Sequence, residues 1–376
     1  MIPIDGICTS QFDAVRDTFE QNFAKGRDVG ASVALIVDGE LVVDLWGGHL
    51  DAERTTPWQS DTLVHVHSIT KTMVALCALI LIDRGLIDPD APVATYWPEF
   101  AANGKENILV RHLMSHTAGL PGWDHPVEVD DVYDWDLACA KLAAQPAWWP
   151  EGEASGYHLI SYNHVVGELI HRVSGKRFEQ FFADEITGPN NIDYHIGYSP
   201  EIADRFTPMI PDTKAGFDFT SIDPEGIAMR TFMGPFLGAA YGSLDYLSRS
   251  VPMNGIANAR SIAQAQAVVS HGGTYNGRTL LSQSTLDTVF REQSNGIDLV
   301  LGIPTRFGIG YGLPLEQWPI KPDSTCWWAG MGGSLMINVL GKRATFAYAM
   351  NQSDNSGLIG DDRSMNLFVA CMESLR

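Results

Sequence analysis

The two ends of the chain carry the same arrangement, a helix pattern beside a pair of strand patterns, and this limits the folds that the chain can adopt. Near the N-terminus, residues 11–26 place four apolar side chains on one helical face, behind the candidate caps Thr9 and Ser10. These four side chains are Phe12, Val15, Phe19 and Phe23. Residues 31–48 follow with two β-rich runs around Asp38-Gly39, a turn pair whose glycine supplies the positive φ of a tight hairpin.

The C-terminal end repeats this arrangement in the opposite order. Residues 334–352 contain two strand patterns joined near Leu340-Gly341. Residues 361–375 then close the chain with an amphipathic helix pattern. The matching ends predict one antiparallel sheet built from both termini.

The middle of the chain has a different character. Residues 85–300 contain many Gly and Pro residues and several helix patterns, among them 160–175 and 257–273, with few alternating strands. This predicts an α+β fold. We expect a discontinuous sheet domain, 1–84 and 301–376, and a mostly helical subdomain, 85–300.

The charge balance excludes some classes of partner. The 376 residues include 25 Lys and Arg against 45 Asp and Glu, a formal net charge of −20, so phosphate backbones and anionic membrane surfaces would repel the chain. We expect neither nucleic acid nor a membrane as a partner. The longest apolar run, residues 73–82, is about half of the ~20 residues needed to span a bilayer and predicts a buried helix.

Cysteine usage and the first residues bear on location. The five cysteines are widely scattered, odd in number and free of C-x-x-C spacing, which indicates neither a disulfide framework nor a zinc site. The first residues show no basic region followed by an apolar one, and no small-residue cleavage pattern. Both observations predict a cytoplasmic protein.

Residues 65–76, HVHSITKTMVAL, contain a Ser-x-x-Lys pair where a β-branched run gives way to the apolar run. If a helix begins at Ser68, Lys71 lies one turn further on the same face, and its amine can reach the hydroxyl. The helix N-terminus also directs backbone N–H groups toward the serine, where negative charge would develop during acyl transfer. The other interpretation is a helix cap at Ser68 with a solvated Lys71, and the pair alone favours it.

Three further stretches accompany this pair. Residues 113–121 read LMSHTAGLP, Tyr157 follows Gly152 by five residues, and Trp328-Ala329-Gly330 leads into a glycine-rich strand. As a set and in this order, the motifs resemble the serine β-lactamase and penicillin-binding-protein superfamily through almost the whole chain. The closest likeness is to its class C-like branch and the family VIII carboxylesterases. The resemblance implies an antiparallel sheet flanked by helices, plus a helical subdomain, with the active site in the cleft between them.

The resemblance also implies roles for individual residues. Ser68 would be the nucleophile, Lys71 its partner and Tyr157 the tyrosine of the second motif. The backbone N–H groups of Ser68 and Met331 would form the oxyanion hole. A serine needs a base within hydrogen-bond reach, and a lysine of ordinary pKa is only ~0.04% neutral at pH 7, a handicap of roughly 4.6 kcal/mol. Burial and a coupled phenol could remove it, and the sequence leaves open which of the two groups takes the proton.

Two positions depart from the class C-like pattern. In the second motif, Tyr157-His158-Leu159 has leucine in place of asparagine, so an amide contact to a β-lactam side chain is lost. The third motif begins with Trp328 in place of lysine or histidine, which removes the cation that would meet a substrate carboxylate. Gly330 permits a close backbone approach. We expect Leu159, Trp328 and Gly330 to line a substrate site of the esterase type.

One rival exists for the second motif. Ser161-Tyr162-Asn163 imitates the Ser-x-Asn of class A enzymes, but the spacing from Gly152 favours Tyr157. Four tryptophans could line an acyl pocket or belong to the core, and the sequence leaves both open. They are Trp123, Trp135, Trp148 and Trp149.

Histidines offer a metal site as another interpretation. His65 and His67 would alternate on one strand face, but no acidic partner or third histidine lies at a useful spacing. His112 and His116 lie four apart on a possible helix, within a stretch that matches a structural part of the family. We interpret all four as structural. In the absence of a phosphate loop or dinucleotide motif, we expect no cofactor and no metal.

The expected function is hydrolysis of carboxylic esters of short to medium acyl chain through an acyl-Ser68 intermediate, with a small-molecule substrate. The alternatives in the same enzyme class are amide chemistry on a β-lactam or D-amino-acid peptide and acyl transfer to an alcohol. A non-catalytic binding protein that retained the cleft is an alternative from another class.

Overall fold

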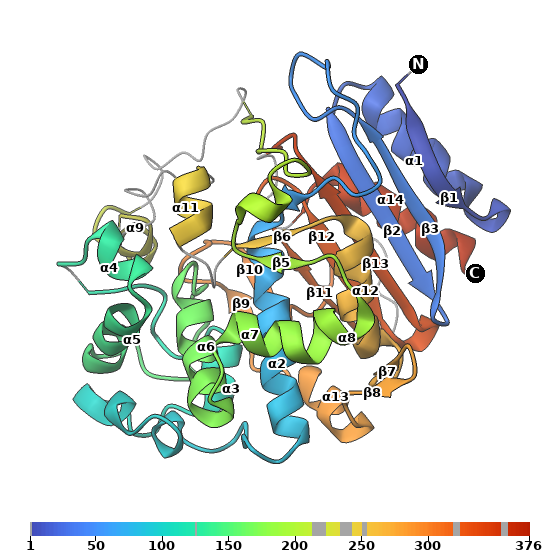
Figure 1. The fold of residues 1–376 in the computed structure, drawn as a ribbon. Coiled ribbons are helices and arrows are strands. Elements are labelled where there is room, and N and C mark those ends of the chain that lie inside the picture. Colours follow the sequence, from blue (N-terminus) through green and yellow to red (C-terminus); the bar gives the residue numbers. More distant parts are fainter. Residues whose placement is uncertain are drawn as a thin grey trace.

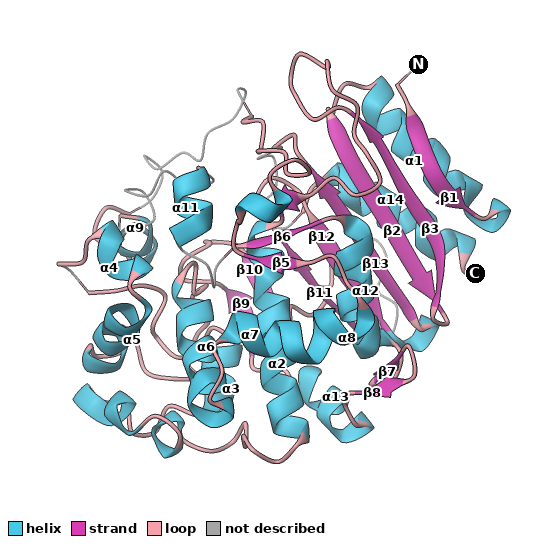
Figure 2. Cartoon of the chain, in the orientation of Figure 1, coloured by secondary structure: helices cyan, strands magenta, loops and turns pink. Residues whose placement is uncertain are grey.

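An antiparallel sheet between two layers of helices forms the centre of the protein (Figure 1, Figure 2). The computed structural model describes residues 2–124, 126–212, 223–233, 243–249, 254–318, 324–354 and 360–376. The sheet strands are β1 (Ile4–Cys8), β2 (Gly30–Val37), β3 (Glu40–Gly48), β11 (Thr325–Ala329), β12 (Leu335–Val339) and β13 (Ala344–Met350). Their order across the sheet is β1-β3-β2-β13-β12-β11. The α+β class and a sheet built from both chain ends are therefore confirmed.

Both predicted hairpins are present, with one difference in turn chemistry. Asp38 and Gly39, at φ 51° and 88°, join β2 to β3 in the left-handed conformation that the turn pair predicts. Between β12 and β13 the chain makes a 3₁₀ turn, and the left-handed residue is Arg343 at φ 45°. The turn there is therefore longer than Leu340-Gly341 alone suggests. Strand β1, which pairs with β3, was not expected from the sequence pattern.

Two helices from the chain ends cover one face of the sheet. They are α1 (Asp13–Ala24) and α14 (Asp362–Ser374), which also contact each other (Figure 1). The four expected apolar residues of the first helix pattern are buried there. The predicted caps were wrong: residues 10–12 form a 3₁₀ turn, and neither Thr9 nor Ser10 makes a side-chain cap bond.

The other face is covered by α12 (Ala259–Ser270), which packs on β2, β12 and β13, and α2 (Thr70–Asp83) packs against α12. α2 is buried from Thr70 to Leu81, as its apolar run predicts. α12 is fixed to the sheet by Ser32 Oγ, which accepts the Ala259 N–H at 3.1 Å, and by an Arg260–Asp44 ion pair at 2.7 Å. The division into a sheet domain and a helical subdomain stays a prediction, and α12 shows that part of residues 85–300 packs directly on the sheet.

Most of the remaining helices and strands are short, and the longest of them are α5 and α6. The helices are α3 (Val110–Met114), α4 (Val129–Tyr133), α5 (Trp135–Ala144), α6 (Ser161–Ser174), α7 (Phe178–Phe182), α8 (Gly188–Asn190), α9 (Ile227–Phe232), α11 (Leu244–Arg249) and α13 (Gln283–Val289). The strands are β4 (Val64–His65), β5 (His195–Ile196), β6 (Gly255–Ala257), β7 (Thr274–Tyr275), β8 (Arg278–Thr279), β9 (Ser294–Ile297) and β10 (Pro304–Phe307). No helix in the described ranges combines the length and the hydropathy that a bilayer crossing requires.

A buried ion network supports the turn that follows β11. The Arg363 side chain is fully buried and pairs with Asp28 at 3.0 Å and with Asp361 at 2.6 Å. The same guanidinium donates from Nη2 to the Gly332 carbonyl at 2.8 Å. Removing one partner of such a buried network typically costs about 3–5 kcal/mol of folding stability. The network therefore fixes the position of this turn.

Candidate active site

The chain enters α2 through a strained turn. β4 ends at His65, and a 3₁₀ turn spans His67–Ile69. His67 has φ 50°, a conformation that costs a non-glycine residue about 1–3 kcal/mol and that clusters at functional sites. Neither this turn nor α2 receives a side-chain cap bond. Ser68 is therefore not a helix cap, and its hydroxyl is left for another use.

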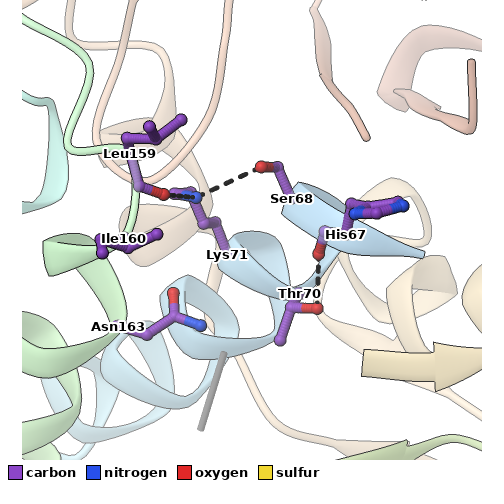
Figure 3. Close-up of a pocket in the computed structure, with 7 residues that line it drawn as sticks. All are labelled: His67, Ser68, Thr70, Lys71, Leu159, Ile160 and Asn163. Carbon is purple, nitrogen blue, oxygen red and sulfur yellow. Dashed lines mark hydrogen bonds between the residues drawn. The ribbon is translucent and has the colours of Figure 1, made fainter. Parts of the chain in front are cut away.

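Lys71 lies on the first turn of α2 and points at Ser68 (Figure 3). Its Nζ is 3.3 Å from Ser68 Oγ and donates to the Leu159 carbonyl at 2.8 Å. The side chain is only 5% exposed, so it is not the solvated lysine of the cap interpretation. Burial lowers the pKa of Lys71 to about 7, because the charged amine loses water and gains only neutral acceptors.

Tyr157 is the third residue of this site and lies next to Lys71. Its ring centroid is 4.8 Å from Lys71 Nζ, and its phenol makes hydrogen bonds with the side chains of Ser68 and Trp328. Burial raises the pKa of Tyr157 to about 12, and those two hydrogen bonds oppose the rise. The two shifts run in opposite senses, since burial favours the neutral amine of Lys71 and the protonated phenol of Tyr157. They favour Lys71 as the proton acceptor, and its assignment as the base stays a prediction.

Trp328 lies behind Tyr157 in an aromatic cluster. It is 4% exposed on β11, and its ring centroid is 6.1 Å from that of Tyr157 and 5.4 Å from that of His116. Because the indole N–H can only donate, its hydrogen bond to Tyr157 places a neutral donor at the phenol oxygen. A contact of Trp328 with substrate stays a prediction. The contact that the structure gives it is with Tyr157.

The turn after β11 approaches the start of α2 closely. A Cβ on Gly330 would lie 2.4 Å from the Val66 carbonyl oxygen, so only glycine fits there. Met331 follows, and its side chain is 45% exposed. Within the described part of the chain, neither the Ser68 nor the Met331 N–H donates to a backbone carbonyl. An oxyanion hole requires backbone donors that are free of carbonyl partners, and the expectation that these two N–H groups form one stays a prediction.

The first two residues of the rival second motif bond to main-chain carbonyls and not to Ser68. Ser161 Oγ donates to the Leu120 carbonyl at 2.7 Å, and the Tyr162 hydroxyl contacts the Met114 carbonyl at 3.4 Å. Asn163 does line the small pocket that Ser68 and Lys71 share (Figure 3). Leu159 lines the same pocket, and its carbonyl makes the contact with Lys71, which residue types alone do not indicate (Figure 3).

The four histidines considered as metal ligands are buried or nearly so, and His67 lines the pocket at Ser68. His67 lies in the turn and not on a strand with His65, yet their ring centroids are 4.0 Å apart. α3 ends before His116, so His116 and His112 do not share a helix as expected. Burial lowers the pKa values of all four, which keeps them neutral. No group of three or more His, Cys, Asp and Glu in the described ranges could hold a metal ion.

The tryptophans left open by the sequence belong mainly to the packing. Trp123 is 1% exposed and donates to the Ala138 carbonyl at 2.9 Å. Trp148 donates to Asp124 at 2.7 Å and stacks with Arg230 at 3.9 Å. None of the four lines the pocket at Ser68, as far as the chain is described.

Comparisons with known proteins show which family and fold the chain resembles. A family model described as Beta-lactamase matches residues 15–370. Esterase/beta-lactamase LipL of Mycobacterium tuberculosis is 31% identical, over 94% of this chain and 86% of LipL. The crystal structure of a family VIII carboxylesterase is 37% identical with a TM-score of 0.90, covering 99% of this chain and 100% of that one. A penicillin-binding protein homologue from Caulobacter crescentus is 35% identical with a TM-score of 0.92, over 99% and 100% of the two chains.

The pKa of Lys71 predicts how the reactivity of Ser68 depends on pH. Because burial lowers that pKa to about 7, the neutral amine becomes the majority form as the pH rises through this value. The rate at which a fluorophosphonate labels Ser68 should therefore rise roughly tenfold between about pH 6 and pH 8 and then level off. Time courses of intact mass at each pH give this rate.

His158 provides the control. Burial lowers its pKa to about 3, so it is neutral throughout this range and His158→Gln should keep the rise. A rise that is lost in His158→Gln, or one centred near the ordinary pKa of lysine, would contradict Lys71 as the base.

Proposed function

The chain belongs to the beta-lactamase family, and within that family we propose that it is a carboxylesterase that forms an acyl intermediate on Ser68. The observation that carries the proposal is the buried Lys71 amine 3.3 Å from the Ser68 hydroxyl. The family VIII carboxylesterase and LipL, named an esterase/beta-lactamase, are similar over nearly the whole chain. Family, fold class and ester hydrolysis all agree with the motif resemblance.

In the first half of the reaction, the ester is attacked by serine. Ser68 Oγ forms a bond to the carbonyl carbon while its proton passes to neutral Lys71 Nζ. The tetrahedral intermediate then collapses, the bond to the alkoxide breaks, and the alcohol leaves with a proton supplied by protonated Lys71. Tyr157, hydrogen-bonded to Ser68, is placed to stabilise these charges with its O–H.

The carbonyl oxygen needs donors while it carries negative charge. We assign this role to the backbone N–H groups of Ser68 and Met331. The close approach of Gly330 to Val66 and the unpaired state of both N–H groups in the described chain support the assignment. Such preorganised donors are worth about 2.7–4 kcal/mol each in serine hydrolases.

The second half of the reaction uses the same groups. Water attacks the acyl carbon and gives a proton to Lys71, and Ser68 regains a proton as the acid is released. An alcohol in place of water would give a new ester, so acyl transfer is the alternative outcome of this half-reaction.

The site lacks features that anionic substrates need. Among the described residues that line the pocket, the basic side chains are His67 and Lys71; burial lowers the pKa of His67 to about 3 and that of Lys71 to about 7. Arg306, a distant cation that could have compensated for Trp328, is paired with Glu292 at 2.5 Å. These observations favour neutral esters over β-lactams and peptide C-termini, which remain the second candidate because LipL carries both names.

The substrate partner and the location are part of the proposal. A small-molecule ester is the proposed substrate, and the net charge of −20 disfavours nucleic acid and anionic membranes. All five cysteines are free thiols, which suits a reducing compartment such as the cytoplasm.

Ser68, Lys71 and Tyr157 should act as one unit. Ser68→Ala, Lys71→Ala and Tyr157→Phe should each lower kcat for a p-nitrophenyl ester by roughly 10³-fold or more, and the Lys71–Tyr157 double variant should be little worse than either single one. Steady-state kinetics with purified variants measure this.

Ser161→Ala is the matched control, because its hydroxyl bonds Leu120 and not Ser68. It should keep near-normal turnover. Losses in the double variant that multiply, or an inactive Ser161→Ala with an active Tyr157→Phe, would show that the unit is wrongly assigned.

The enzyme should have a much higher kcat/KM for neutral esters than for anionic substrates. A partly desolvated carboxylate without a cation is costly, so kcat/KM for p-nitrophenyl butyrate should exceed that for nitrocefin by at least ~10³-fold, equivalent to about 4 kcal/mol. Trp328→Lys places a cation at this position and should reduce the ratio of kcat/KM for the ester to kcat/KM for nitrocefin. Equal turnover of the two substrates by the wild type would refute the esterase assignment in favour of a β-lactamase.

A further inference from the structure

One buried carboxylate outside the catalytic motifs reaches the main chain of Tyr157. Asp298 follows β9, is fully buried, and accepts three backbone N–H groups with its Oδ1. Two bonds are local, from Val300 and Leu301, both at 2.9 Å. The third comes from Tyr157 at 3.0 Å, across 141 residues of sequence.

Two further contacts join the same two segments. The Leu299 N–H donates to the Ser155 carbonyl at 2.8 Å, and the hydroxyls of Ser155 and Thr305 lie 3.2 Å apart. The loop between β9 and β10 is therefore attached along the chain that leads to Tyr157. Asp298 makes the contact nearest to the phenol.

The segment around Tyr157 is also held by individual bonds to its neighbours, among them one from Trp149 Nε1 to the Ala154 carbonyl at 3.0 Å. Residues 154–158 form no helix or strand, so their path is set by individual contacts. On the side away from Asp298, His116 holds this chain by accepting the Gly156 N–H with its carbonyl and the His158 N–H with its Nδ1. The Tyr157 N–H, which lies between these two N–H groups in the sequence, has Asp298 Oδ1 as its acceptor. A buried donor left without its acceptor costs about 1–3 kcal/mol, which is enough to favour a shifted main chain.

The position of Asp298 also affects the phenol electrostatically. Its negative charge raises the pKa of Tyr157, in addition to the effect of burial. This helps to keep Tyr157 protonated as a donor while the neighbouring Lys71 loses its proton.

We propose that Asp298 is a positioning residue for Tyr157: it holds the Tyr157 main chain where the phenol meets Ser68. This inference rests on the proposed acyl-Ser68 chemistry. A displacement of about 1 Å at a catalytic group can lower a rate by roughly 10²-fold, so loss of the Oδ1 acceptor should act mainly on kcat.

Side-chain variants give the first test. Asp298→Leu removes the acceptor at similar volume and should lower kcat for p-nitrophenyl butyrate by at least ~10-fold, with KM within about threefold of wild type. Asp298→Asn keeps an oxygen acceptor and should restore most of kcat. Ser155→Ala, which loses the contact with Thr305 on β10 and leaves the Asp298 bonds in place, should match the wild type.

A backbone variant tests the bond itself, and it serves if Asp298→Leu does not fold. Replacing Tyr157 by its α-hydroxy-acid analogue, through nonsense suppression, exchanges one amide for an ester and removes only the Tyr157 N–H. The same exchange at Val300 removes a bond to the same Asp298 oxygen and is the matched control. We expect kcat to fall at least ~10-fold in the Tyr157 variant and to stay near wild type in the Val300 variant.

The outcomes separate this inference from the proposed function. Wild-type kcat in both Asp298→Leu and the Tyr157 ester variant, in an enzyme that Ser68→Ala inactivates, would overturn the positioning role alone. Equal losses from the Tyr157 and Val300 exchanges would also overturn it, because the loop as a whole would then be responsible. Activity that survives Ser68→Ala would instead overturn the proposed function.

Discussion

Burial of Lys71 beside Ser68 is the interaction on which the chemistry of this protein depends. The amine is held by the Ser68 hydroxyl and the Leu159 carbonyl, which are neutral, so its charge gains little in exchange for lost hydration. A pKa of about 7 removes most of the roughly 4.6 kcal/mol that keeps an ordinary lysine protonated. The fold enforces this, because α2 is buried along nearly its whole length and Lys71 itself is only 5% exposed.

The site is assembled from segments that are distant in the sequence and meet at one end of the sheet. The 3₁₀ turn before α2 supplies Ser68, α2 supplies Lys71, and an irregular segment supplies Tyr157. The turn after β11 holds Met331, whose N–H we propose as an oxyanion donor. A buried charged side chain bonds to the main chain of each irregular segment. Asp298 accepts the Tyr157 N–H, and Arg363 donates to the Gly332 carbonyl. Rigid helix and strand ends thus position the reactive groups, and buried polar contacts fix the connections between them.

The sequence alone predicts the features that depend on residues close to one another along the chain. The 161–174 helix ending at Gly175, the Asp38-Gly39 hairpin and the Ser68–Lys71 spacing follow from periodicity, turn residues and helix geometry. Local patterns could not reveal β1, whose five residues gain strand structure only by pairing with β3. They also could not link Asp298 to Tyr157 or the Leu159 carbonyl to Lys71, because those contacts exist only after the chain has folded. The caps expected at Thr9 and Ser10 failed because a 3₁₀ turn occupies that position.

Direct observation of the acyl-enzyme tests the central claim, that the lysine-activated Ser68 is the nucleophile. The wild-type protein would be mixed with p-nitrophenyl butyrate, quenched in acid within the first turnover, and analysed by intact mass and peptide mapping. The account predicts one butyryl group per chain, located on Ser68, that disappears as turnover is completed. Ester turnover with no covalent adduct, or with the acyl group on any other residue, would contradict it.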